Sequence, residues 1–326
     1  MSTEPVLGKM QAVPLRDIWP HEAHNFTPWL LNNSGLLGDV LGMDIEISNA
    51  EHPVGGYSLD LIGQDVATGD RLIIENQLEQ SDHSHLGQLL TYASGTEAVN
   101  IVWVASNFRA EHRAALDWLN DRTDEKTRFF GIEISAVKIN DSIPAPLMRL
   151  VAQPNDWNKK VKASTAGKSS ALGGLYYDFW SLLLDELASS KPGWSAAKTP
   201  STDNWRYLSS GISGIYFALS FSQKGLCSAI YFGNSSADIN AALYAALEKE
   251  KSQIEQSISR ELSWEPLDGK TASRVGEYYP GNISDTEAWP EFVEWFLKSQ
   301  SDLRRVFSDR KSKLQDIRSS LKAEDK

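Results

Sequence analysis

Short apolar segments with a strand pattern alternate with segments of helical spacing through the first half of the chain. Residues 43–48 (MDIEIS) alternate apolar and acidic side chains, as a half-buried strand does. Residues 100–106 (NIVWVAS) are almost continuously apolar, which is typical of a central buried strand. A further strand is predicted at 129–139, and helices are predicted at 20–42, 83–94 and 110–119. We expect Gly35 and Gly38 to break the first of these helices, and Ser81 or Asp82 to cap the second. The pattern predicts an α/β domain with helices flanking the sheet.

Residues 57–64 and 71–77 have the pattern of a β-hairpin whose turn is Thr68-Gly69-Asp70. A hairpin that is symmetric about this turn brings Asp60 on the first strand near Glu75 on the second. Glu75 and Gln77 are two residues apart, so their side chains leave the same face of the strand. The sequence therefore predicts that two carboxylates and an amide converge at one end of the sheet. Such a set of hard oxygen ligands suits Mg²⁺ or Mn²⁺.

The next predicted helix carries His85, Gln88 and Tyr92 on one stripe, because offsets of three, four and seven share a helix face. We expect this stripe to face the carboxylates, and we expect Gly87 to let the helix approach the sheet closely.

The second half begins after a polar stretch of small residues, 155–174, which we interpret as a linker. We expect a first domain at 1–155, the linker at 156–170 and a second domain of the α+β class at 171–326. Its predicted elements are a helix at 175–190, two strands within 214–233, one long helix at 237–260 and a helical region from Thr286 onward.

Composition narrows the class of protein. Apolar residues make up 41% and charged residues 23% of the chain, as in ordinary globular proteins. We expect no membrane span or signal peptide, because no apolar stretch has the length or position for either. The single cysteine, Cys227, excludes an internal disulfide and a cysteine-based zinc site, and it favours a cytoplasmic location. The net charge of −11 argues against phosphate binding by bulk charge alone.

The order of these residues resembles the PD-(D/E)XK nuclease superfamily in its RecB-like form. That form has an aspartate, an E-x-K strand motif and a Q-x-x-x-Y helix motif; this chain has Asp60, then Glu75-Asn76-Gln77, then Gln88 to Tyr92. LGQLLTY also resembles the mismatch endonuclease family NucS/EndoMS. The resemblance covers about residues 20–140.

The resemblance implies a metal-dependent endonuclease with a nuclease-like mixed sheet, acting in defence or DNA repair. It makes Asp60 and Glu75 the ligands of Mg²⁺ or Mn²⁺. Gln77, Gln88 and Tyr92 complete the catalytic set, with His85 and Glu22 as further candidates for contacts around the metal or phosphate. DNA is favoured over RNA as the partner, and a homodimer is one option for the assembly.

One position departs from the motif: the superfamily lysine is Gln77 here, and glutamine carries no charge. The alternative hypothesis is therefore a module that kept the fold and lost the chemistry, and serves nucleic-acid binding or protein interaction.

Several candidates also have plainer interpretations. For Glu22 the favoured interpretation is an exposed glutamate at a helix start. His83 and His85 lie two apart on a helix, so they do not face one zinc ion. The basic run Leu303–Lys322 is either a solvated helix face or a phosphate-contacting element. Five tryptophans among apolar neighbours are expected mainly in the core: Trp103, Trp118, Trp180, Trp264 and Trp295.

The C-terminal half resembles a bacterial domain of unknown function that occurs downstream of such nuclease-like domains, from the stretches DFWSLLLDEL, AALYAALEKEKSQIEQSISRELSWEPLDGKTASRV and EAWPEFVEWFLKSQSDLRRVF. We find no catalytic motif in it, and expect it to serve target recognition or self-association.

Overall fold

The computed structural model describes residues 8–124, 126–154, 171–267 and 271–324. The chain divides into two compact units, one of residues 1–65 and 69–168 and one of residues 66–68 and 169–326. The expected linker, 156–170, lies outside the described residues. In the described part of the chain, no helix is long and apolar enough to cross a membrane.

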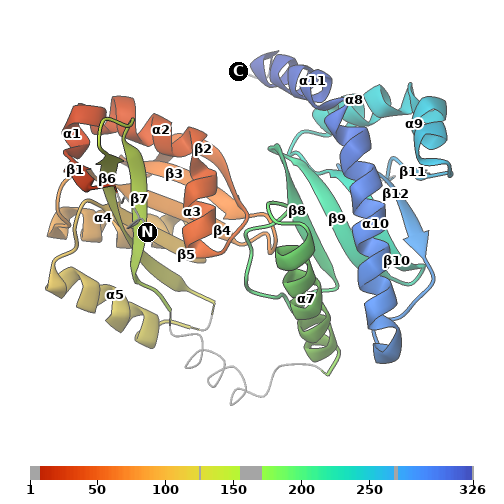
Figure 1. The fold of residues 1–326 in the computed structure, drawn as a ribbon, viewed down its shortest axis with the longest axis horizontal. Coiled ribbons are helices and arrows are strands. Elements are labelled where there is room, and N and C mark those ends of the chain that lie inside the picture. Colours follow the sequence, from red (N-terminus) through yellow and green to blue (C-terminus); the bar gives the residue numbers. More distant parts are fainter. Residues whose placement is uncertain (1–7, 125, 155–170, 268–270, 325–326) are drawn as a thin grey trace, which may run out of the picture. The chain divides into compact units, whose positions relative to one another are not determined.

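The first unit contains a seven-stranded mixed sheet in the order β1-β6-β5-β4-β3-β2, with β7 paired to β6 (Figure 1). Strands β4, β5 and β6 are mutually parallel neighbours, and the other pairs are antiparallel. The strands are β1 Met10–Val13, β2 Ile45–Val54, β3 Tyr57–Asp65, β4 Arg71–Asn76, β5 Asn100–Ala105, β6 Arg128–Ile139 and β7 Ala145–Ala152. The helices are α1 Leu15–Ile18, the π-helical turn η1 Glu22–Phe26, α2 Thr27–Asn32, α3 Ser34–Leu41, α4 His83–Thr96 and α5 Ala110–Arg122.

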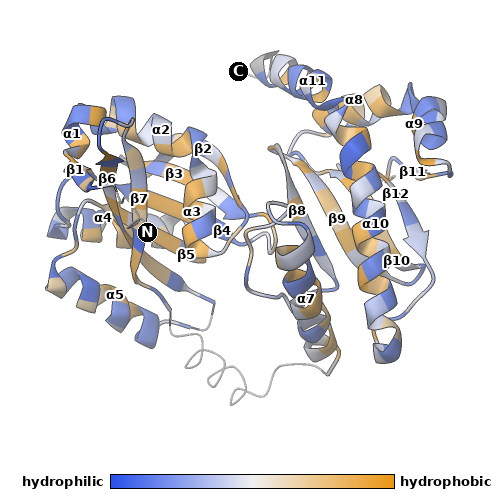
Figure 2. Cartoon of the chain, viewed as in Figure 1, coloured by the Kyte–Doolittle hydropathy of each residue, from blue (hydrophilic) through white to orange (hydrophobic). Residues whose placement is uncertain are grey.

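Helices cover both faces of this sheet, and the apolar central strands lie between them (Figure 2). On one face, Leu72 and Ile74 of β4 pack with Leu30 of α2 and Leu37 of α3. On the other face, Ile73 packs with α4 and α5. All six residues of β5 are buried, because successive side chains enter opposite cores. The prediction of a mixed sheet flanked by helices is confirmed.

The predicted hairpin is present and has the expected register. Leu61 of β3 pairs with Ile74 of β4, and the backbone N–H of Asp65 donates to the carbonyl of Asp70 at 2.9 Å. Gly69 supplies the left-handed backbone that the turn needs, with φ 74°. Asp82 caps α4 by accepting a hydrogen bond from the backbone N–H of His85, as predicted.

Several predictions on glycine were wrong. The helical region 20–42 breaks at Asn33, between α2 and α3, whereas Gly35 and Gly38 lie inside α3. Gly38 serves packing instead, since a Cβ there would lie 2.6 Å from the carbonyl oxygen of Met43. Gly87 is exposed, and a Cβ there would meet nothing within 4 Å, so it does not bring α4 close to the sheet.

The second unit contains a five-stranded antiparallel sheet in the order β11-β12-β10-β9-β8 (Figure 1). Its core joins one face of the sheet to helices α7, α8 and α10. The strands are β8 Trp205–Ile212, β9 Ile215–Ser222, β10 Gly225–Phe232, β11 Ser263–Glu265 and β12 Ser273–Tyr279. The helices are α7 Ala171–Ser190, α8 Ala237–Glu248, α9 Lys251–Ile258, η2 Thr286–Ala288, α10 Trp289–Ser308 and α11 Lys311–Glu324.

The long helix predicted at 237–260 is wrong, because the chain leaves the helical conformation between α8 and α9. Glu250 has φ −108° and ψ 13°. Its carboxylate accepts hydrogen bonds from Arg310 at 2.7 Å and Lys313 at 2.6 Å. These partners come from the C-terminal part of the chain, so helical spacing in 237–260 gave no sign of them.

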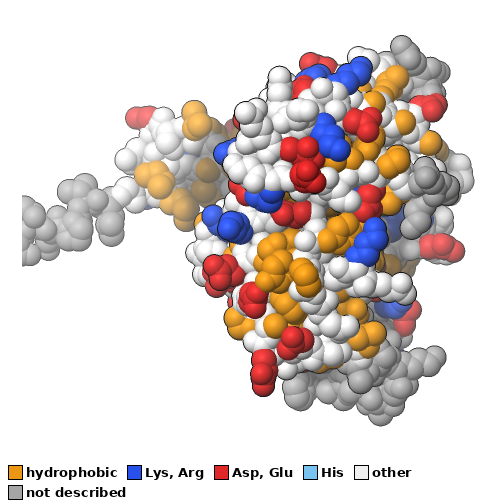
Figure 3. All heavy atoms as spheres, turned by 90° about the vertical axis from the view of Figure 1, so that its right-hand side faces the viewer, with side chains coloured by type: hydrophobic (Ala, Val, Ile, Leu, Met, Phe, Trp, Pro, Cys, Tyr) orange, Lys and Arg blue, Asp and Glu red, His pale blue; other side chains and the backbone are white. Residues whose placement is uncertain are grey.

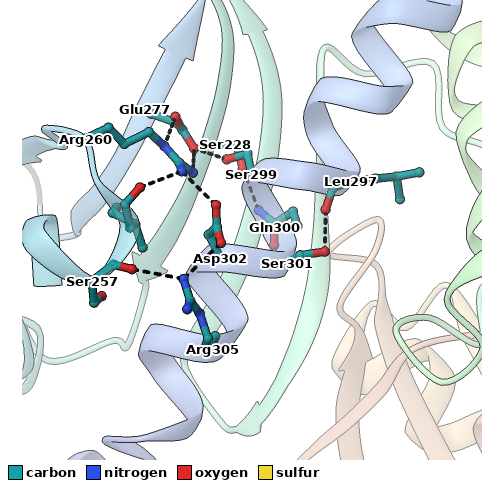
Figure 4. Close-up of polar contacts among 11 residues, drawn as sticks. Ser228, Ser257, Arg260, Glu277, Leu297, Ser299, Gln300, Ser301, Asp302 and Arg305 are labelled. Atoms are coloured by element: carbon teal, nitrogen blue, oxygen red, sulfur yellow. Dashed lines mark hydrogen bonds and ion pairs between the residues drawn. The ribbon is translucent and has the colours of Figure 1, made fainter.

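A polar network fixes α10 against the sheet of the second unit (Figure 4). Arg260 bridges Glu277 of β12 and Asp302 of α10, with N–O distances of 2.7 Å to each. Gln300 of α10 donates to the buried Ser228 hydroxyl on β10 at 2.9 Å. These side chains are occupied in holding the fold together.

The basic run Leu303–Lys322 is largely engaged within the second unit. Arg304 stacks on the rings of Trp194 and Phe217, at 4.4 and 4.2 Å from the ring centres. Arg305 pairs with Asp302, and Arg310 pairs with Glu250. Cationic and acidic side chains also alternate on the face shown in Figure 3. This arrangement favours a structural role for the run over a phosphate-contacting one.

The tryptophan predictions were partly right. Trp103 and Trp180 are fully buried, and Trp264 and Trp295 pack half-buried against the core. Trp118 was wrong: it is 59% exposed, on the outer side of α5.

Gly63 gives a test of how tightly the strands around the candidate site are packed. A Cβ there would lie 2.1 Å from the carbonyl oxygen of Glu46 on β2. We expect Gly63→Ala to destabilise the protein by about 1–3 kcal/mol, because the strands must move apart. Gly87→Ala is the matched control and should stabilise by about 0.5–1 kcal/mol, since alanine favours the helix. Denaturant unfolding measures both; equal stability of Gly63→Ala and the wild type would contradict the packing.

Candidate active site

Asp60 of β3 and Glu75 of β4 lie on neighbouring strands. Leu61 pairs with Ile74, so Asp60 and Glu75, the next residues along this antiparallel pair, stand opposite each other. The Asp60 Oδ2 atom accepts hydrogen bonds from the backbone N–H of Asn76 at 2.8 Å and from its Nδ2 at 2.6 Å. Glu75 is only 4% exposed, and its Oε2 atom is buried without a hydrogen-bond partner among the described residues. Burying a carboxylate oxygen without a hydrogen-bond partner lowers the stability of the fold, so this atom is expected to bind a ligand or a proton.

Both carboxyl groups hold their protons more tightly than usual. Burial raises the pKa of Asp60 to about 7, and the backbone N–H of Asn76 only partly offsets it. Burial, then the negative charge of Asp60, raises the pKa of Glu75 to about 9. Two buried like charges in one place each resist ionisation unless a cation joins them.

Two further carboxylates act on this pair. Glu22 at the start of η1 accepts a hydrogen bond from the backbone N–H of Leu78 at 2.6 Å, and its charge raises the pKa of both Asp60 and Glu75. The interpretation of Glu22 as an exposed helix-start residue was therefore wrong, since a half-buried site contact holds it.

Glu51 is the residue that the sequence analysis missed. It lies between two paired positions, Ala50 with Leu61 and His52 with Leu59, and so stands opposite Asp60. Its charge also raises the pKa of both site carboxyl groups. The signal was available, because a hairpin symmetric about Gly55-Gly56 places Glu51 there by the same reasoning that paired Asp60 with Glu75.

Gln77 is buried, and both ends of its amide are occupied by neighbours. Its Oε1 accepts from the indole N–H of Trp103 at 2.9 Å. Its Nε2 donates to the carbonyl of Gln80 at 2.9 Å and to Asp82 Oδ2 at 3.2 Å. The side chain thus braces the end of β4 against β5 and the start of α4.

Helix α4 presents Tyr92 and His85 to the site in different ways. Tyr92 is 1% exposed and donates its hydroxyl to the carbonyl of Ser58 at 2.9 Å, so it joins the helix to β3. Burial, then the charges of Glu75 and Asp60, raises the pKa of Tyr92. Gln88 is half-buried, and its side chain makes no hydrogen bond within the described part of the chain. His85 is close enough that its charge lowers the pKa of Asp60.

The two histidines of the sequence Asp82-His83-Ser84-His85 have separate partners. His83 Nδ1 lies 3.0 Å from Nε2 of His112, whose Nδ1 lies 2.8 Å from the Ser81 hydroxyl. His85 pairs with Asp82 instead. The expectation that they do not share a zinc ion agrees with this geometry.

The donor set fits a hard divalent cation that keeps part of its water shell. Among the described residues, no group of three or more His, Cys, Asp or Glu is arranged to hold a metal ion. Mg²⁺ commonly takes one or two carboxylates and fills the rest of its shell with water and substrate. Asp60 and the unpartnered Oε2 of Glu75 meet that requirement.

Comparisons with known proteins add little to this geometry. Residues 175–311 match the family described as Domain of unknown function (DUF4268), which agrees with the predicted C-terminal domain. A repair endonuclease from Pyrococcus abyssi is similar with a TM-score of 0.26 and 16% identity, over 28% of this chain and 41% of that chain. A likeness of this extent carries no argument for the function of the whole chain. No curated protein matches.

The raised pKa of Glu75 predicts how stability depends on pH. Between its ordinary value of 4.5 and about 9, the folded protein keeps a proton that the unfolded chain has released. The contribution of this protonated carboxyl to the free energy of unfolding is therefore complete below about pH 4.5, and it is lost as the pH rises through about 9. Glu75→Gln should melt near the wild type at pH 5 and above it at pH 9, in the presence of a chelator.

The matched control is Glu79→Gln, which removes a carboxylate whose side chain is 70% exposed. Its melting temperature should follow the wild-type pH curve, because an exposed pair contributes little. Parallel curves for Glu75→Gln and the wild type would contradict a strained buried carboxyl at position 75.

Proposed function

We propose that the first unit is a metal-dependent nuclease domain that hydrolyses phosphodiester bonds, with Mg²⁺ or Mn²⁺ held by Asp60 and Glu75. The observation that carries the proposal is the buried Oε2 atom of Glu75, which has no hydrogen-bond partner in the described residues and lies beside a second strained carboxyl. A structural pair of this kind would normally be hydrogen-bonded or neutralised by a basic side chain. Because Asp60 and Glu75 resist ionisation in the absence of a cation, a role as ligands of a cation is favoured.

The charge of the site makes a cation necessary for a phosphate to approach. Glu22 and Glu51 both act electrostatically on Asp60 and Glu75, so a phosphodiester would meet net negative charge. A divalent cation bound here would polarise the phosphate and lower the pKa of a bound water. Asp60 is oriented for such binding by Asn76, which Thr27 holds in turn through its hydroxyl at 3.0 Å.

The wider role is part of the same proposal. DNA is the favoured substrate, in defence or repair, and the second unit would serve recognition or pairing into a homodimer. The occupied basic residues of its last helices argue against binding through that run, so recognition would use another surface.

A catalytically silent binding module is the second candidate. The observation that favours it is Gln77, whose amide is fully used in bonds to Trp103, Gln80 and Asp82. With both ends of its amide occupied, Gln77 is poorly placed for the catalytic part that the resemblance implies, and catalysis would need another residue for it.

The proposal predicts that the isosteric variants Asp60→Asn and Glu75→Gln lose metal-dependent cleavage while they keep the fold. Each removes a ligand charge, and several kcal/mol of transition-state stabilisation correspond to a loss of more than about 100-fold. The assay follows cleavage of supercoiled plasmid, single-stranded DNA and RNA with Mg²⁺ or Mn²⁺, and Glu79→Gln is the control. Wild-type rates in either site variant, with circular dichroism unchanged, would overturn the assignment.

The variant Gln77→Lys distinguishes a catalytic role of position 77, which the motif implies, from the structural role that its hydrogen bonds indicate. If position 77 supplied the catalytic group, lysine should raise the rate; in this structure lysine leaves the buried indole N–H of Trp103 without an acceptor, at a cost of about 1–3 kcal/mol. We therefore expect lower stability and no gain in cleavage. A faster lysine variant would show that position 77 acts directly on the reaction.

A further inference from the structure

His85 and Asp82 form a dyad at the edge of the carboxylate site. The Asp82 carboxylate lies 3.0 and 2.9 Å from the Nδ1 atom of His85 through its two oxygens, and its Oδ1 also accepts the backbone N–H of His85 at 2.9 Å. Both residues begin the same helix, so the cap and the ring contact fix the imidazole in one orientation.

The carboxylate also sets the state of the ring. Partial burial opposes ionisation of Asp82, but the hydrogen bonds from the backbone and ring of His85 outweigh it and lower the pKa of Asp82. An ionised carboxylate only accepts hydrogen bonds, so Nδ1 must carry a proton. In the neutral ring Nε2 then keeps its lone pair, and it has no hydrogen-bond partner among the described residues.

The dyad is near the carboxylates and is braced by the same residue that fills the lysine position. Gln77 lies two residues beyond Glu75. Tyr92, which lies two turns after His85 on α4, donates its hydroxyl to the carbonyl of Ser58, two residues before Asp60. Gln77 donates to the second oxygen of Asp82. Gln77 therefore supports the residue that holds the histidine.

We propose that His85 is the general base of this site, with Asp82 and Gln77 as positioning residues; this inference rests on the proposed nuclease function. Nε2 takes a proton from the attacking water as the water oxygen forms its bond to phosphorus. The bond from phosphorus to the leaving sugar oxygen breaks, and that oxygen takes a proton from solvent. His85 then returns its proton to solvent, so the charges balance over one turnover.

The kinetic test compares His85→Ala with His83→Ala. General-base catalysis is worth about 100- to 10,000-fold, so His85→Ala should lower kcat by at least about 100-fold with little change in KM. Added imidazole should restore part of the rate. His83→Ala is the matched control, because His83 is exposed and pairs with His112 rather than with Asp82, and it should keep the wild-type kcat. Asp82→Asn keeps a capping oxygen and should lower kcat while the helix remains.

A second measurement needs neither metal nor substrate. Nitrogen-15 NMR of the metal-free protein at pH 8 should show His85 with its proton on Nδ1, and Asp82→Asn should lose that preference. Metal affinity should not change in His85→Ala.

The outcomes separate the two proposals. A wild type that cleaves, with His85→Ala within twofold of its kcat or with the His85 proton on Nε2, overturns the general-base assignment alone. A wild type that binds Mn²⁺ and cleaves none of the three nucleic acids overturns the proposed function, and the assignment of His85 with it.

Discussion

The repulsion between the buried carboxylate of Glu75 and the half-buried carboxylate of Asp60 is the constraint on which the candidate site depends. Asp60 and Glu75 stand on adjacent strands, and burial raises the pKa of each. Neither can ionise cheaply while the other is charged, and the Oε2 atom of Glu75 has no hydrogen-bond partner within the described residues. Replacing a buried charged pair by apolar residues is often stabilising, so a destabilising pair of this kind favours a functional role. In the proposed function, this site releases protons and accepts a divalent cation.

The surrounding sheet keeps these charges together. Strand β3 lies between β2 and β4, so Asp60 meets Glu51 on one side and Glu75 on the other. The N-terminal turn η1 adds Glu22 through a bond to the backbone of Leu78, just beyond β4. On the far side of Glu75, the parallel pairing with β5 brings Trp103 to the strand, where its indole fixes Gln77. Packing and charge are therefore coupled, because the residues that shape the site also hold three strands and α4 in place.

The sequence predicted what depends on local periodicity and turn symmetry. The β3–β4 turn at Gly69 placed Asp60 near Glu75, and the Asp82 cap placed the start of α4. The contacts of Gln77 could not be predicted, because Trp103 is far away in sequence and its pairing depends on the crossover through α4. The position of Glu22 depends on how η1 packs on the sheet, and the end of α8 depends on Arg310. These features come from tertiary contacts that override local propensity.

Metal binding measured by calorimetry tests the central claim most directly. Titration of Mn²⁺ into the protein at pH 7, in two buffers of different protonation enthalpy, reports both the affinity and the protons released. Because Glu75 holds its proton at this pH and Asp60 is half-titrated, binding at this pair should release about one to two protons. The signal should be lost in Asp60→Asn and in Glu75→Gln. Binding of equal strength in these variants, or binding without proton release, would contradict a metal site built on the two strained carboxylates.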